Sequence, residues 1–104
     1  MSKKLTVPKE IKLGARTFKV SYNKDIVYDN NWSGCISQRH GTIEICPDYN
    51  DEYKMITLFH EIFHAICYQY NIEIDEKDND RLANGMAEFL KNNLDVTLDW
   101  GEIR

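Results

Sequence analysis

The stretch His60-Glu61-Ile62-Phe63-His64 constrains this chain most, because it lies inside a segment that predicts a long helix. Residues 53–70 are apolar on nearly all sides of such a helix, which is typical of a central, buried element. Residues four positions apart lie on the same helix face, one turn apart. The two imidazoles can therefore bind one zinc ion, with Glu61 beside a metal-bound water.

The alternative interpretation is that these polar residues are ordinary core residues. A single buried histidine is usually just hydrogen-bonded. Two histidines and a glutamate on one buried helix are harder to explain, because each buried polar group costs free energy unless it is paired, and a carboxylate costs more. A divalent cation would supply the compensating charge. The pattern therefore favours zinc binding by His60 and His64.

The first half of the chain predicts two hairpins. Residues 10–13 and 16–22 flank a two-residue turn signal at Gly14-Ala15. Residues 34–37 and 42–46 form the second hairpin, and residues 23–31 read as a polar connector. We expect these strands to form a small antiparallel sheet.

The second half predicts two helices. The metal-binding helix follows Pro47, which ends the last strand, and runs to about Tyr70, with Asn71 in a left-handed C-terminal position. Asp75 opens a second helix at about 76–92. Its expected apolar face contains Leu82, Ala83, Met86, Phe89 and Leu90.

Two expectations complete the fold. Gly85 inside the second helix costs about 1 kcal/mol relative to alanine, and close approach to the first helix is one reason to tolerate it. Residues 94–100 are expected to dock as an irregular tail. Residues 1–104 are thus predicted to be one α+β domain, with N-terminal hairpins packed on two helices.

Charge and composition exclude several classes of protein. A net charge of −4 with scattered basic residues argues against nucleic-acid binding. The chain has no apolar run near the roughly 20 residues that span a membrane, and no signal-peptide pattern, so we expect a cytoplasmic protein. Cys35, Cys46 and Cys67 suit reduced thiols rather than a disulfide framework.

A catalytic zinc site takes three protein ligands and leaves one position for water. The second helix is the expected source of the third ligand. Spacing leaves two candidates there, Glu76 and Asp80, and does not choose between them.

The two motifs together resemble a known family. His60-Glu61-Ile62-Phe63-His64 followed by Asp80-Arg81-Leu82-Ala83-Asn84-Gly85 resembles the ImmA/IrrE-type metallopeptidases, particularly short versions carried by phages and other mobile elements. The similarity spans about residues 42–90. In that family an acidic residue three positions before an Ala-Asn pair is the third ligand. By position it falls on Asp80, although glutamate is commoner there, so the resemblance favours Asp80 over Glu76.

The resemblance implies a minimal zincin-like fold and a zinc-dependent endopeptidase. Zinc bound by His60, His64 and Asp80 would lower the pKa of a water molecule to about 7, and Glu61 would act as the general base. The family's architecture implies that an edge strand at residues 42–46 holds the substrate by strand addition. The implied substrate is one protein or peptide partner, such as a repressor of a mobile element's genes. Stabilisation of the oxyanion is left open among Tyr49, Tyr53, His40 and Arg81.

The alternative function is a non-catalytic protein that keeps the metal for structure and sequesters a regulator. A fourth protein ligand would support it, with His40 or Cys67 as the nearest candidates. Glu61 argues against it, because a purely structural site has no use for a carboxylate placed as a base.

Overall fold

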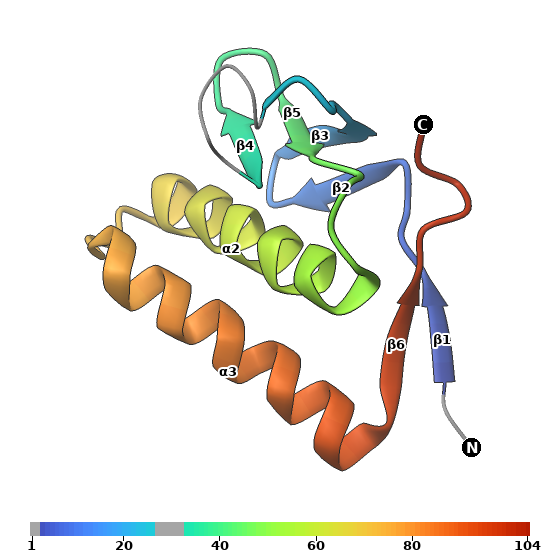
Figure 1. The fold of residues 1–104 in the computed structure, drawn as a ribbon. Helices are drawn as coiled ribbons and strands as arrows, with labels where there is room; N and C mark the ends of the chain where they lie inside the picture. The colour runs from blue at the N-terminus through green and yellow to red at the C-terminus, as the bar shows by residue number, and fades with distance from the viewer. Residues whose placement is uncertain (1–2, 27–32) are drawn as a thin grey trace.

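The computed structural model describes residues 3–26 and 33–104, and these residues adopt an α+β fold. A four-stranded sheet packs on one side of a central helix, and a second helix packs on the other side (Figure 1). The predicted fold class is therefore confirmed. In chain order the elements are β1 (Lys3–Thr6), β2 (Glu10–Leu13), β3 (Arg16–Tyr22), β4 (Gly34–Ser37), β5 (Thr42–Ile45), α2 (Asp51–Tyr70), α3 (Glu76–Leu94) and β6 (Val96–Asp99).

The four-stranded sheet has the order β2-β3-β5-β4 and is mixed. The two predicted hairpins are present as the antiparallel pairs β2–β3 and β4–β5. The prediction of an entirely antiparallel sheet was wrong, because β3 and β5 pair in parallel. A hairpin's pairing follows from its short turn, but the pairing of two strands from different hairpins depends on the connection between them. Most of the predicted connector, residues 27–31, lies outside the described residues.

This strand order also corrects the predicted substrate-binding edge. β5, within the expected segment 42–46, lies between β3 and β4 and is therefore interior. The described edge strand on this side is β4, which also packs against α2.

The predicted irregular tail is partly a strand. β6 pairs in parallel with β1, from Lys3 opposite Val96 to Thr6 opposite Asp99 (Figure 1). The sequence signal was weak because the strand is only four residues long and its partner lies at the other end of the chain. Trp100, which follows β6, is buried in the main core.

α2 starts shortly after Pro47 and ends at Tyr70, as predicted. The Asn50 side chain accepts a hydrogen bond from the Tyr53 amide at 2.8 Å, and Asn71 closes the helix with a φ of 55°. Leu58 and Ala65 face the sheet and join the main core. The strand and C-terminal residues of this core are Val7, Phe18, Val20, Ile43, Ile45, Trp100 and Ile103.

α3 begins at its predicted N-cap, but the face that it buries is rotated from the one expected and shares with it only Ala83 and the partly buried Leu90. The Asp75 side chain accepts a hydrogen bond from the Asp78 amide at 2.7 Å. The fully buried residues of α3 are Asn79, Ala83 and Ala87, whereas three of the predicted core residues are exposed: Leu82, Met86 and Phe89. The buried positions thus carry an amide and two small side chains, and most of the larger apolar side chains of α3 lie on its exposed side.

Gly85 does not mark the contact between the helices. A Cβ atom built at this glycine meets no other atom within 4 Å, so the proposed close approach at Gly85 was wrong. Within the described residues, neither α2 nor α3 has the length and apolar character needed to cross a bilayer.

Candidate metal centre

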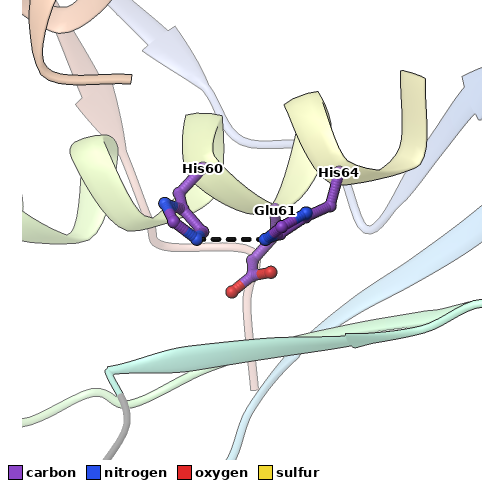
Figure 2. A group of neighbouring side chains, drawn as sticks. All are labelled: His60, Glu61 and His64. Atoms are coloured by element: carbon purple, nitrogen blue, oxygen red, sulfur yellow. Dashed lines mark hydrogen bonds between the residues drawn. The ribbon is translucent and has the colours of Figure 1, made fainter. Parts of the chain in front are cut away.

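His60, Glu61 and His64 come together on the side of α2 that faces β4. Figure 2 shows all three side chains leaving the helix toward this strand. The Nε2 atoms of the two histidines lie 3.1 Å apart. One donor atom from each of the three residues lies within 4.8 Å of the others. The spacing of the motif therefore produces the predicted cluster.

The cluster could hold a divalent metal ion. Two imidazole nitrogens bound to one tetrahedral zinc, each at 2.0–2.1 Å, lie about 3.3–3.4 Å apart. The observed 3.1 Å is close to that separation. Two ring nitrogens directed at the same point repel each other unless a proton or a cation lies between them, so the arrangement suits a bound cation.

The first turns of α3 bring both predicted carboxylates to this cluster. Oε1 of Glu76 lies 2.5 Å from Nε2 of His60, and Oε2 lies 3.0 Å from Nε2 of His64. Oδ1 of Asp80 lies 3.5 Å from the other ring nitrogen, Nδ1 of His60. Glu76 therefore faces the two nitrogens that converge, whereas Asp80 lies behind one of the rings. The third ligand stays a prediction, and this geometry favours Glu76, the alternative, over Asp80.

Asn79 contributes to the centre in a way that the sequence analysis missed. Its side chain is fully buried, and its Nδ2 donates a hydrogen bond to the backbone carbonyl of His60 at 3.1 Å. This contact links α3 to α2 at His60. The available signal was an asparagine at helical spacing with Ala83 and Ala87, on the face that proved to be buried.

Burial controls the protonation of Glu61. Only 6% of the surface of Glu61 is exposed. Burial is the main cause that raises the pKa of this carboxyl from 4.5 to about 7; His60 opposes the increase, and Glu76 adds to it. A carboxylate with a pKa near neutrality can both accept and return a proton.

The pKa of Glu61 predicts how the stability of the metal-free protein depends on pH. Because the folded-state pKa is raised, the folded protein binds this proton more tightly than the unfolded chain does. Stability should therefore fall as pH rises from about 4.5 to about 7, by up to about 3 kcal/mol. Urea unfolding of chelator-treated protein at several pH values would measure this loss. Glu61→Gln should show a smaller decrease in this window, and an unchanged slope would contradict the assignment.

Neither His40 nor Cys67, the two candidates for a fourth ligand, joins the donor cluster found among the described residues. Cys67 nevertheless lines the groove described below. Cys35 is a free thiol whose Sγ lies 3.6 Å from Oε1 of Glu44. Burial, followed by Glu44, raises the pKa of Cys35 to about 11, so this thiol stays protonated near neutrality.

The candidate centre lies in a groove of about 960 Å³ whose walls include α2, β4 and the beginning of α3. Two of the four residues considered for stabilising an oxyanion, Tyr49 and Tyr53, line this groove. The other two, His40 and Arg81, are not among its lining residues. Arg81 instead forms an exposed ion pair with Asp78 at 3.3 Å.

Comparisons with known proteins give no relative for this chain. No family model matches it, and no curated protein or solved structure shows significant similarity. The ImmA/IrrE-type resemblance therefore stays a prediction that depends on the two motifs alone.

Proposed function

We propose that this protein is a zinc-dependent metallopeptidase that hydrolyses a peptide bond in a specific protein substrate. The main support is the position of Glu61, a buried carboxylate beside two imidazoles whose Nε2 atoms converge. A structural metal site needs the imidazoles but not this acid. The open groove along the same face of α2 supplies room for a substrate.

Three side chains would hold the zinc: His60, His64 and Glu76. Asp80 would accept a hydrogen bond from Nδ1 of His60 and so fix the orientation of that ring. When bound, zinc supplies a Lewis acid that polarises a carbonyl group and makes water more acidic. Zinc suits two imidazoles and a carboxylate better than magnesium or calcium, which prefer oxygen ligands.

Glu61 would act as the general base and then as the general acid. Its carboxylate takes a proton from the attacking water, and the water oxygen forms a bond to the scissile carbonyl carbon. The same proton then passes to the leaving nitrogen as the carbon–nitrogen bond breaks. The products are a new carboxyl group and a new amine.

β4 would align the substrate. This strand is paired with β5 on one side only within the described sheet, and its residues Gly34, Cys35 and Ile36 border the groove opposite the metal-binding residues. An extended peptide could add to this edge through backbone hydrogen bonds.

The motif resemblance supports a repressor of a mobile element as the natural substrate, and a cytoplasmic location follows from that role.

Metal analysis combined with peptide cleavage tests the proposal. The purified protein should contain about one zinc per chain on the expected ligand count. His60→Ala and His64→Ala should abolish zinc retention, whereas His40→Ala, which changes an exposed histidine of the β4–β5 turn, should not. Chelator treatment should stop the cleavage of a quenched fluorescent peptide library, and added zinc should restore it. Zinc content that is insensitive to His64→Ala would contradict the proposed site.

A further inference from the structure

Exposed aromatic side chains extend the metal-binding face of α2 in both directions. Tyr53 lies seven residues before His60, and Tyr68 lies four residues after His64, so all four share one helix face. Both tyrosines line the groove and are exposed, Tyr53 over 44% of its surface and Tyr68 over 64%. The face is therefore polar in the middle and aromatic toward both ends.

Tyr53 and Tyr68 each have a second large side chain beside them in the groove lining. Tyr49 stacks against Tyr53 with ring centroids 4.6 Å apart and an interplanar angle of 23°. At the other end, Ile72 is exposed and lines the groove together with Tyr68. Exposed apolar surface beside a polar centre is typical of a ligand-binding groove, because burying it on binding is favourable.

The distance between Tyr53 and Tyr68 sets the length of a peptide that can reach both. Tyr53 and Tyr68 are fifteen positions apart on α2, which corresponds to about 22 Å along the helix axis. An extended peptide covers this distance with about seven residues. The metal-binding residues lie between the two tyrosines, so a peptide that reaches both must continue past the centre in both directions.

We propose that the groove binds an extended, unstructured protein segment through two large apolar side chains about seven residues apart. One side chain would pack on Tyr49 and Tyr53, and the other on Tyr68 and Ile72. The position of the cleaved bond rests on the proposed peptidase activity. With that activity, the bond that is cut lies between the two anchoring side chains. The substrate class is then an internal segment of a protein rather than a chain terminus.

Peptide binding to the Glu61→Gln variant tests this proposal without cleavage. The probes are fluorescein-labelled peptides of about twelve residues, built from Ser, Thr and Lys because Glu76 and Asp80 make one wall acidic. One peptide carries two Phe residues seven positions apart, one carries them two apart, and one has no Phe. Fluorescence anisotropy should show the tightest binding for the first peptide.

Tyrosine variants in the same Glu61→Gln background identify the surface that binds. Tyr53→Ala and Tyr68→Ala should each weaken binding of the first peptide about tenfold, the size typical of removing an aromatic anchor. Tyr70→Ala is the matched control, because Tyr70 is 61% exposed on the same helix but does not line the groove. This variant should bind as tightly as its parent.

Three results would overturn the proposal: no peptide binds, binding ignores the Phe spacing, or Tyr68→Ala weakens binding no more than Tyr70→Ala. The peptide series tests the spacing even if a tyrosine variant folds poorly. Failure of the groove proposal can be distinguished from failure of the proposed peptidase activity. Tyrosine-dependent binding without cleavage by the wild-type protein would contradict only the enzymatic function. Cleavage without tyrosine dependence would contradict only the groove.

Discussion

Glu61→Gln is expected to keep its zinc and its fold while losing peptide hydrolysis by about 10²- to 10⁴-fold. Glutamine has nearly the same shape as glutamate but cannot accept the proton that water must lose. Glu61 is not one of the three side chains proposed to hold the metal, so zinc content should not change. The measurement is cleavage of the quenched peptide library, compared at equal zinc content, with circular dichroism to check the fold.

Glu73→Gln is the matched control for this variant. Glu73 is an exposed glutamate in the connection between α2 and α3, so the substitution changes the same charge away from the centre. It should cleave the library at the wild-type rate. If Glu61→Gln cleaves within a few-fold of the wild-type rate, Glu61 is not the general base. A non-catalytic metal-binding protein then becomes the better interpretation.

The local features of this fold could be predicted from the sequence because they depend on neighbouring residues. The i, i+4 spacing of His60 and His64 placed both rings on one side of α2. Pro47 before that helix and Asn71 after it marked its limits, because proline ends the strand and asparagine tolerates the left-handed C-terminal position. The two hairpins followed from their short turns. In each case the deciding contacts lie within a few residues.

Features that depend on distant contacts were not predictable in the same way. The parallel pairing of β3 with β5, and of β1 with β6, joins segments that no turn links directly. The rotation of α3 was predicted only in part: Ala83 of the expected apolar face is buried, but Leu82 and Met86 of that face are exposed. The actual contact uses Asn79 and Ala83, where the alanine is small and the amide has a partner on α2.

The rotation of α3 also explains why the third ligand could not be chosen from the sequence. Glu76 and Asp80 are one turn apart, so both belong to the stripe that faces α2 on the side of the metal centre. Which carboxylate meets the two Nε2 atoms depends on how far α3 is rotated and where along α2 it sits. In this structure Asn79 donates a hydrogen bond to the His60 carbonyl, and in the same arrangement of the helices Glu76 lies at the imidazoles.

Glu76→Gln is expected to weaken zinc binding far more than Asp80→Asn. Removing the carboxylate charge from a direct ligand should weaken zinc binding by more than the 10- to 100-fold typical of changing a residue that only hydrogen-bonds to a ligand. Asp80→Asn should fall within that range, because an amide oxygen can still accept a weaker hydrogen bond from Nδ1 of His60. Competition with a chromophoric chelator would measure both affinities. Asp78→Asn, on the same turn of α3 but outside the groove lining, serves as the control.

The order of these two affinities decides the composition of the centre. If Asp80→Asn loses more zinc affinity than Glu76→Gln, Asp80 is the third ligand, as the motif resemblance implies, and α3 must shift when the metal binds. The Oδ1 atom of Asp80 now lies near Nδ1 of His60, on the opposite side of the ring from Nε2. Its ligation would require this contact to break and the imidazole or the helix to move. Ligation by Glu76 requires no such movement, because its two oxygens already face both Nε2 atoms.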